Sequence, residues 1–193
     1  MKKELRKEYL KKRNLLTKGE IQQRSREITK KILSSSFYKK AEWIFTYINI
    51  NSEVETIPLI EQAWKDKKKI AVPIARKERE MHFVILKDFS QLRQTKMGVL
   101  EPPFCKENIV NSIGKQVLFF VPGSVFDLEC NRFGYGGGYY DTYFEKYPEG
   151  IKLGLAYDFQ VIEKLPVEQF DKKLDAIVTE LKWIGGDNSE NFK

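Results

Sequence analysis

Apolar and polar positions along the chain follow two periods, one typical of helices and one typical of strands. Residues 2–16 are strong helix formers that place Leu5 and Tyr9 on a recurring apolar face. Thr17 and Glu20 then fit a capping box, the pattern that begins a helix by satisfying its free backbone N–H groups. The chain is therefore expected to open with two helices.

Strand patterns and helix patterns alternate after these two helices. The run Val117–Val121 is apolar at every position, which is typical of a strand buried on both faces. Residues 97–107 contain Pro102 and Pro103, so we expect an extended surface loop there. The pattern predicts helices at 56–67 and 139–147 and strands at 43–48, 69–74, 81–87, 117–121, 152–157 and 176–179.

This alternation predicts an α/β fold, in one three-layer domain whose mainly parallel sheet is flanked by helices. The expected domain spans residues 1–193, with a basic helical segment at 1–36 and a polar tail at 185–193. A chain of 193 residues is long enough to bury one sizeable core. With 41% hydrophobic residues it has a globular composition rather than a disordered one.

Several classes of protein are disfavoured by what the sequence lacks. No apolar run approaches the roughly 20 residues that span a bilayer, and the charged first residues lack the apolar centre of a secretory signal. Cys105 and Cys130 are too far apart to suggest a zinc site or a disulfide framework. His82, the single histidine, argues against His-rich metal sites and Ser-His-Asp catalysis. We expect a cytoplasmic protein.

The net charge of +7 is concentrated at one end of the chain. Residues 1–40 hold 14 Lys and Arg against 4 Asp and Glu, whereas the remaining residues hold 20 against 23. Such a basic segment attracts polyanions, and the candidates are a nucleic acid, an acidic membrane, or a nucleoside triphosphate with a carboxylated substrate. Two solvated helices with Lys-rich outer faces remain the alternative.

The run from Arg132 to Asp141 carries the strongest chemical signal. Its glycines follow the buried strand at 117–121 and lead into the predicted helix at 139–147. Glycine lets the backbone approach an anion closely, and a helix start presents N–H groups to it. With Arg132 as a cation and Asp141 as a hard oxygen ligand, the pattern indicates a phosphate cradle beside a Mg²⁺ site.

Standard phosphate-binding motifs do not describe this run. No Lys-Ser or Lys-Thr pair follows the glycines, as a P-loop requires, and twelve residues separate Val121 from Gly134, too many for a dinucleotide fingerprint. A glycine-rich bulge with a purely structural role therefore remains an alternative.

Three separated blocks of residues carry a family resemblance. They are Lys2-Lys3-x-Leu5-Arg6, Asn51-x-Glu53-Val54-x-Thr56, and Val121-Pro122-Gly123-x-x-Phe126-Asp127 continued by Arg132-x-Gly134-x-Gly136-x-Gly138-Tyr139-Tyr140-Asp141. A weaker block runs from Leu165-Pro166-Val167 to Asp171. In these residues the chain resembles the 5-formyltetrahydrofolate cyclo-ligases, also called 5,10-methenyltetrahydrofolate synthetases. Ser124-Val125 departs from the usual pattern, in packing more than in chemistry.

The resemblance implies a Rossmann-like fold similar to the sugar-phosphate isomerase and CoA-transferase type. It also implies an ATP- and Mg²⁺-dependent cyclisation of 5-formyltetrahydrofolate to 5,10-methenyltetrahydrofolate, with release of ADP and phosphate through a phosphorylated formyl intermediate. Phosphoryl transfer of this kind relies on positioning and charge neutralisation, so the protein itself needs no nucleophile. The implied partners are ATP and the folate, with or without a polyglutamate tail, and the protein is expected to be a monomer without nucleic-acid or membrane partners.

The resemblance also assigns roles to individual residues. Arg132 and Tyr140 are the expected catalytic residues, and Asp141 and Asp171 the expected Mg²⁺ ligands, with Asp175 as the alternative to Asp171. Glu53 is expected to accept two N–H bonds from the pterin. The expected ATP site comprises Lys2, Lys3, Arg6, Arg132, Phe133, Gly134, Tyr135, Gly136, Gly137, Gly138, Tyr139 and Tyr140. The expected folate site comprises Ile48, Glu53, Tyr135, Gly136, Gly137, Gly138 and Tyr139.

Two other functions are alternatives to the cyclo-ligase activity. A nucleic-acid-binding protein would use the basic helices, but they contain little interleaved aromatic character and no recognisable RNA or DNA module. A catalytically silent relative would have no chemical reason to keep the glycine run and the carboxylates together.

Overall fold

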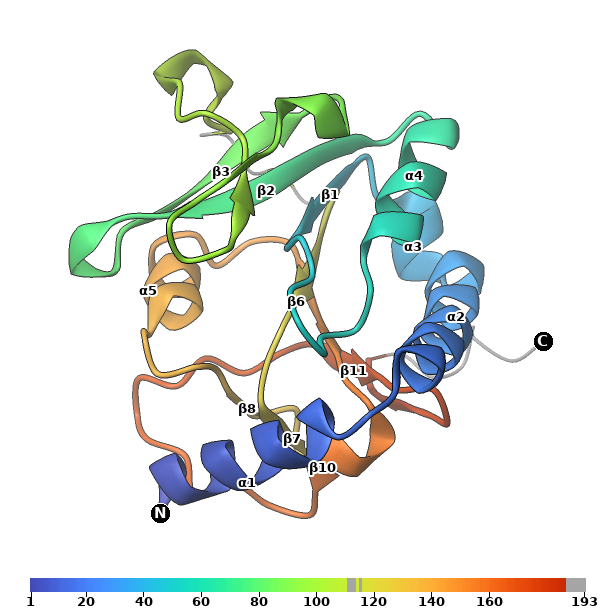
Figure 1. Cartoon of the computed structure of the whole chain (residues 1–193), viewed down its shortest axis with the longest axis vertical. Coiled ribbons are helices and arrows are strands. Elements are labelled where there is room, and N and C mark those ends of the chain that lie inside the picture. The colour runs from blue at the N-terminus through green and yellow to red at the C-terminus, as the bar shows by residue number, and fades with distance from the viewer. Residues whose placement is uncertain (111–113, 115, 187–193) are drawn as a thin grey trace.

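The computed structural model describes residues 1–110, 114 and 116–186, and its centre is a seven-stranded sheet (Figure 1). The residues predicted to form a polar tail lie outside the described part from 187 onward. In spatial order the strands are β12 (Trp183–Gly185), β11 (Ala176–Val178), β9 (Ile151–Leu155), β6 (Val117–Val121), β1 (Trp43–Thr46), β2 (Lys69–Ala75) and β3 (Met81–Leu86).

The five inner strands of the sheet run parallel, and the two edge strands are antiparallel to their neighbours. From β1 the chain continues outward to β2 and β3, whereas from β6 it continues outward in the opposite direction. The strand order therefore reverses between β1 and β6. In open α/β sheets, ligands bind beyond the carboxyl ends of the strands at such a point.

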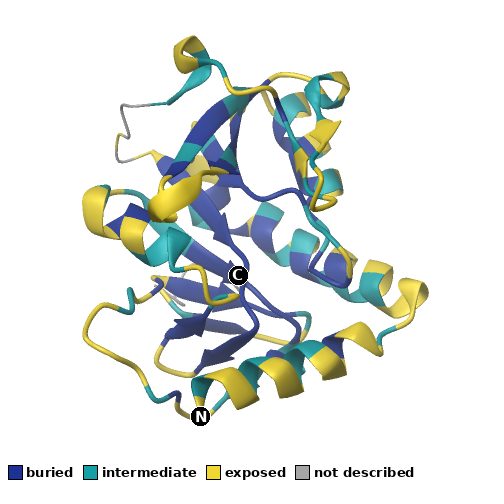
Figure 2. Cartoon of the chain, turned by 60° about the vertical axis from the view of Figure 1, so that its left-hand side comes forward, coloured by how far each residue is buried: buried dark blue, intermediate teal, exposed yellow. Residues whose placement is uncertain are grey.

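Helices cover both faces of the sheet and enclose two apolar clusters (Figures 1 and 2). The cores differ because successive side chains of a strand point to opposite faces. Leu118 and Phe120 pack with the first cluster, whereas Phe119 packs with Phe45 and Tyr143 in the second. One face carries α2 (Lys18–Ser34), α3 (Ser36–Lys40) and α4 (Ile57–Lys65), and the other carries α5 (Tyr139–Lys146).

Helix α1 (Lys2–Asn14) lies apart from the main sheet, against a small three-stranded sheet (Figure 1). Leu5 and Tyr9, the apolar positions recognised in the sequence, pack on a cluster formed by Val125, Phe133 and Leu165. This contact holds the basic helix beside the glycine run. The small sheet consists of β10 (Val161–Ile162), β7 (Val125–Asp127) and β8 (Arg132–Phe133).

The structure confirms the fold class and the predicted start of α2. The Thr17 hydroxyl accepts a bond from the Glu20 backbone N–H at 3.2 Å, and the Glu20 carboxylate accepts one from the Thr17 N–H at 2.8 Å. These two bonds form the capping box. A mainly parallel sheet flanked by helices is likewise the observed architecture.

The shortest strands were not predicted. The sequence pattern ends the sheet at 176–179, but β12 follows and pairs with β11, and the strands of the small sheet were missed as well. Each has two or three residues, which is too few for an alternating pattern to be recognised. The expected extended loop at 97–107 also contains β5 (Leu100–Glu101), which pairs with β4 (Arg93–Gln94).

Candidate functional site

The glycine run links β8 to α5 at the carboxyl end of the main sheet. Gly136 has φ +102° and Gly138 has φ +70°, values in the left-handed region that other residues rarely adopt. Gly138 is the residue before α5 and caps the helix with no side-chain hydrogen bond. The N–H groups in the first turn of α5 therefore point out of the helix end, and no side chain in the described part of the chain caps them. Helix starts that bind anions have the same arrangement.

Arg132 lies beneath this loop and is 5% exposed. Its Nη1 donates to the Pro122 carbonyl at 3.2 Å, its Nη2 lies 3.6 Å from Asp141 Oδ2, and the guanidinium faces the Tyr140 ring at 5.3 Å. The buried Nε has no hydrogen-bond partner within the described residues. An unsatisfied buried donor costs free energy, so this Nε marks a place where an acceptor is missing.

Helix α1 brings further cations to the same loop. Lys2 Nζ and the Arg6 guanidinium carbon lie 5.2 and 5.6 Å from the centre of the Phe133 ring, whose edge is buried in the small sheet. Arg6 Nη1 lies 3.6 Å from the position that a Cβ on Gly136 would occupy. The Arg6 Nε is also buried and without a partner in the described part of the chain.

Two of the expected metal ligands lie beside these cations. Asp141 accepts a bond from the Lys172 backbone N–H at 3.0 Å, which places it next to the segment that contains Asp171. Asp171 accepts from Lys2 Nζ at 2.6 Å. Burial disfavours the charged ammonium of Lys2, but its bonds to Asp171 and Glu168 outweigh this and hold the pKa of Lys2 above its usual value.

Asp175, the alternative ligand, lies elsewhere. Its carboxylate accepts a bond from the Lys152 backbone N–H at 2.7 Å, at the amino end of β9, whereas the glycine run lies at the carboxyl end of the sheet. The geometry therefore favours Asp171. The described residues contain no group of three or more potential metal ligands. Mg²⁺ commonly takes one or two carboxylates together with substrate phosphates, so a pair suffices.

Glu53 lies on the connection between β1 and α4, at the carboxyl end of β1. Three bonds shape this connection: Thr56 Oγ1 to the Tyr47 carbonyl at 2.7 Å, the Thr56 N–H to Asn49 Oδ1 at 3.0 Å, and the Tyr47 hydroxyl to the Val54 carbonyl at 2.9 Å. They fix the backbone that presents Glu53 next to the reversal point between β1 and β6.

The Glu53 carboxylate is 5% exposed but has two hydrogen-bond donors. Tyr135 Oη donates to its Oε1 at 2.6 Å, and the Ile50 backbone N–H donates to its Oε2 at 2.9 Å. Burial raises the pKa of Glu53, while these bonds and the charge of Arg13 act in the opposite direction. Tyr135 thus joins the glycine run directly to the expected pterin acceptor.

Arg13, which is also 5% exposed, was not among the site residues predicted from the sequence. Its Nη1 donates to Tyr135 Oη at 2.9 Å and to the Gly123 carbonyl at 3.3 Å, and its Nε donates to Ser52 Oγ at 3.1 Å. A signal for it existed, because Arg13 follows Arg6 by seven residues and therefore shares its helix face.

The other expected site residues lie around this centre. Tyr139 Oη donates to the Arg76 carbonyl at 2.9 Å, and its ring approaches within 2.7 Å of the Cβ position of Gly137. Ile48 is buried in the apolar cluster beneath the β1–α4 connection. The Tyr140 hydroxyl is buried without a partner among the described groups, and burial raises its pKa far above the usual value.

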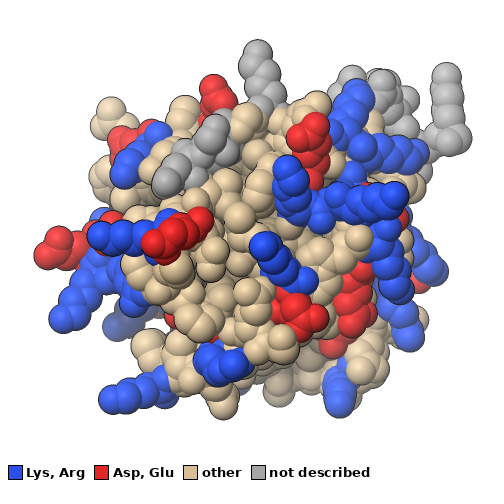
Figure 3. Space-filling view, turned by 90° about the horizontal axis from the view of Figure 1, so that it is seen from above, with Lys and Arg blue, Asp and Glu red and all other residues tan. Residues whose placement is uncertain are grey.

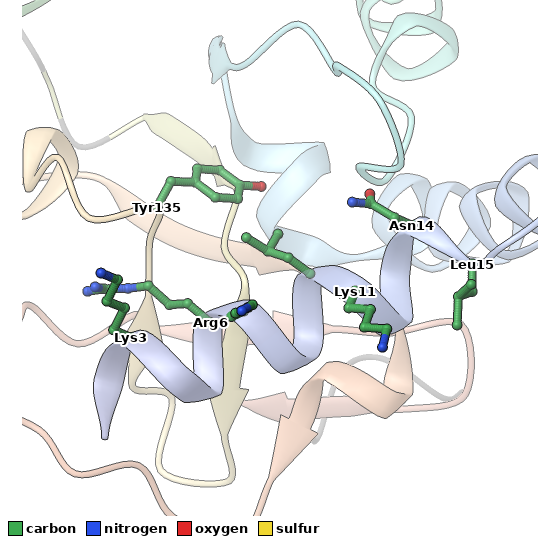
Figure 4. Close-up of a pocket in the computed structure, with 8 residues that line it drawn as sticks. Lys3, Arg6, Lys11, Asn14, Leu15 and Tyr135 are labelled. Carbon is green, nitrogen blue, oxygen red and sulfur yellow. The ribbon is translucent and has the colours of Figure 1, made fainter.

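A groove of about 800 Å³ runs along α1 towards Tyr135 (Figure 4). The hydroxyl of Tyr135 projects over the groove from the glycine run, whereas the opposite wall is helical. The groove has room for a ligand of drug size. Its lining residues are Lys3, Arg6, Lys7, Leu10, Lys11, Asn14, Leu15 and Tyr135.

Known proteins resemble this chain in sequence. The model of the 5-formyltetrahydrofolate cyclo-ligase family matches residues 1–180. A 5-formyltetrahydrofolate cyclo-ligase of Haemophilus influenzae is 28% identical over 175 residues, covering 89% of this chain and 93% of the relative. A probable 5-formyltetrahydrofolate cyclo-ligase of Schizosaccharomyces pombe is 32% identical over 179 residues, covering 85% and 87%.

Solved structures give the same result. The NMR structure of Aquifex aeolicus 5,10-methenyltetrahydrofolate synthetase superposes with a TM-score of 0.82 at 32% identity, covering 100% of this chain and 96% of that one. A 5,10-methenyltetrahydrofolate synthetase from Mycoplasma pneumoniae shares the fold, with a TM-score of 0.70 at 24% identity over 93% of this chain and 98% of that one.

The environment of Glu53 gives a testable dependence of stability on pH. Because its pKa is raised in the folded protein, the folded state keeps this proton to higher pH than the unfolded chain does. The contribution of protonated Glu53 to stability is fully present below the ordinary carboxyl pKa of 4.5. It is lost as the pH rises through the pKa of Glu53 in the folded protein. We expect the difference in free energy of unfolding, wild type minus Glu53→Gln, to fall from acid to neutral pH in urea titrations.

Glu20→Gln provides a control of opposite sign. The backbone N–H of Thr17 lowers the pKa of Glu20, so the corresponding difference should rise with pH. A flat or rising difference for Glu53→Gln would contradict the burial of an ionisable carboxyl at this position.

Proposed function

The chain belongs to the 5-formyltetrahydrofolate cyclo-ligase family, and we propose that it converts 5-formyltetrahydrofolate to 5,10-methenyltetrahydrofolate at the expense of ATP. The geometry adds its own support at the glycine run. Two buried guanidinium nitrogens, the Nε atoms of Arg6 and Arg132, have no acceptor among the described residues and lie near the start of α5, which none of the described side chains caps. A triphosphate supplies negatively charged acceptors for both nitrogens, and this observation carries the proposal.

The phosphates of ATP would be bound from two sides. Lys2, Lys3 and Arg6 approach from α1, whereas Arg132 and the backbone of residues 134–138 approach from the other side. Cations and oriented N–H groups in this arrangement stabilise the charge that develops during phosphoryl transfer. Phe133 supports the α1 cations through its ring face.

Asp141 and Asp171 fit a magnesium ion that accompanies the nucleotide. Both are hard oxygen donors, both are only partly exposed, and both already lie within reach of the cations expected to bind phosphate. When bound, Mg²⁺ supplies charge neutralisation at the phosphates. Lys2 pairs with Asp171 and Arg132 lies beside Asp141, so the carboxylates that would hold Mg²⁺ adjoin the cations that would bind phosphate.

The folate would lie with its pterin edge on Glu53. A buried, ionised carboxylate accepts two parallel N–H bonds from an aminopyrimidinone. Tyr139 provides an aromatic face for the flat heterocycle, Ile48 belongs to the apolar floor below it, and the groove along α1 accommodates the rest of the molecule. Because Tyr135 contacts Glu53 from within the glycine run, the two substrates would meet at that loop.

The chemistry then needs positioning rather than a protein nucleophile. The N5-formyl oxygen attacks the γ-phosphorus and ADP leaves, after which N10 attacks the activated formyl carbon. The carbon–oxygen bond breaks, phosphate leaves with the formyl oxygen, and N10 loses its proton. Tyr140 stays protonated because its pKa is raised by burial, so it can donate a hydrogen bond to a developing anion beside Arg132.

A nucleic-acid-binding role is the less favoured alternative. Several cations of the basic segment point inward, where Lys2, Arg6 and Arg13 contact the glycine run or its neighbours. Figure 3 shows basic and acidic side chains interspersed over the face of the molecule that lies opposite α1. We expect a monomer with no nucleic-acid or membrane partner; no described helix is long and apolar enough to cross a bilayer.

A spectrophotometric assay tests the function directly. Purified protein with 5-formyltetrahydrofolate, ATP and Mg²⁺ should accumulate the absorbance of the methenyl product, and omission of ATP should abolish the signal. The enzyme-free rate is subtracted. Folded protein that gives no ATP-dependent product with adequate Mg²⁺ would sink the proposal.

Arg132→Ala should impair the use of ATP far more than the binding of folate. Removal of a charge-assisted contact to phosphate costs about 1.5–3 kcal/mol, which corresponds to about a tenfold to hundredfold loss in kcat/KM for ATP. Arg93→Ala is the matched control, because Arg93 is exposed and its side chain donates to the nearby carbonyls of Ser90 and Leu92. Equal losses for both substrates, together with a lower melting temperature, would instead indicate general unfolding.

Asp141→Asn should raise the Mg²⁺ concentration needed for half-maximal activity, since an amide is a weaker ligand than a carboxylate for this hard cation. Asp175→Asn serves as the control because Asp175 lies at the other end of the sheet. An unchanged Mg²⁺ titration for Asp141→Asn removes this residue from the metal site, and a shift with Asp175→Asn alone assigns the role to that residue.

A further inference from the structure

The buried side chain of Arg13 carries positive charge from α1 to the ends of two strands. Its guanidinium donates to Tyr135, to the Gly123 carbonyl after β6, and to Ser52 after β1. All these partners are neutral, and no ion pair joins Arg13 to a carboxylate within the described part of the protein. A buried charge that contacts no opposite charge costs free energy. If Arg13 served only to hold these elements together, a neutral side chain would cost less.

We propose that Arg13 is a positioning residue for folate recognition, which directs the Tyr135 hydroxyl to Glu53 and keeps Glu53 as an anion facing the pterin. The inference rests on the proposed role of Glu53 in binding 5-formyltetrahydrofolate. It adds a residue that acts on the ligand through its neighbours rather than by contact.

The direction of one proton supports this role. A phenol has a single hydrogen to donate, together with acceptor lone pairs. Because Arg13 Nη1 donates to Tyr135 Oη, the lone pair on that side is occupied and the phenolic hydrogen is free for Glu53 Oε1, 2.6 Å away. Without Arg13, that lone pair has lost its donor, and the hydroxyl is no longer held in the orientation that directs its hydrogen to Glu53.

The balance of charge around Glu53 supports the same role. The groups facing the carboxylate are Arg13 from α1 and three neutral phenols: Tyr47, which directly follows β1, Tyr135 from the glycine run and Tyr140 from α5. Burial disfavours the anion, and among the described groups Arg13 is the cation that opposes it. Loss of Arg13 therefore favours the protonated carboxyl.

The charge state of Glu53 decides what it can recognise. An ionised carboxylate offers two oxygens that can both accept N–H bonds, as the aminopyrimidinone edge requires, whereas a protonated carboxyl turns one oxygen into a donor. A donor facing a donor repels the ligand. Arg13 consequently favours the binding of a ligand whose edge carries two adjacent N–H groups.

The test compares Arg13→Met with Lys12→Met, which removes the same charge from the next position of α1 on its exposed side. Both variants are assayed for turnover as a function of pH, with the enzyme-free rate subtracted at each pH. For Arg13→Met, KM for 5-formyltetrahydrofolate should rise about tenfold to a hundredfold, with KM for ATP changed far less. The acidic limb of kcat/KM for the folate should move to higher pH, because Glu53 takes up its proton earlier.

Two milder variants separate positioning from folding. Tyr135→Phe removes only the hydroxyl, so it should move the acidic limb in the same direction, and its effect should not add to that of Arg13→Met. Arg13→Lys keeps the cation and should return the limb towards the wild-type position. If Arg13→Met does not fold, Tyr135→Phe and Arg13→Lys carry the test.

The outcomes distinguish the inference from the function on which it rests. Absence of wild-type turnover overturns the proposed function. Turnover that is insensitive to Glu53→Gln overturns the role of Glu53 and with it the inference. If wild type is active and Glu53→Gln weakens folate binding, but Arg13→Met behaves like Lys12→Met, the inference alone is overturned. An unmoved acidic limb in Tyr135→Phe has the same meaning.

Discussion

Buried positive charge is the constraint that determines how the carboxyl end of the main sheet is arranged. A buried guanidinium is tolerated only if acceptors surround it. Arg132 and Arg13 obtain theirs from the carbonyls of Pro122 and Gly123, at the point where β6 ends and the strand order reverses. These acceptors are incomplete, because the Nε of Arg132 has none within the part of the chain that the structure describes. The interior is thus stable enough to fold and still attractive to an anion.

The division between a rigid sheet and a polar end follows from the same arrangement. The rings of Phe45, Phe83 and Phe119 pack against one another on one face of the sheet, and a second apolar cluster covers the opposite face. Because apolar side chains cover both faces of the sheet, polar side chains lie at the ends of the strands. Tyr135 connects the two halves of this polar end, since it belongs to the glycine run, the proposed phosphate cradle, and its hydroxyl donates to Glu53.

Much of the architecture could be predicted because long elements repeat their pattern several times. The apolar run of β6 and the capping box of α2 are signals of this kind, and the structure confirms both. The small sheet was missed since its strands are too short to show a period. Motifs located the glycine run, Glu53 and the carboxylates, but their roles remain predictions. Arg13 escaped notice because its partners, at 52, 123 and 135, are distant in sequence and meet only after folding.

The ion pair between Lys2 and Asp171 spans 169 positions of the chain. Because a chain is synthesised from its N-terminal side, α1 leaves the ribosome well before Asp171 does. Until then Lys2 lacks this partner, and Leu5 and Tyr9 lack Leu165, one of the residues on which they pack. The proposed nucleotide site is consequently completed only after the segment that contains Asp171 has been synthesised.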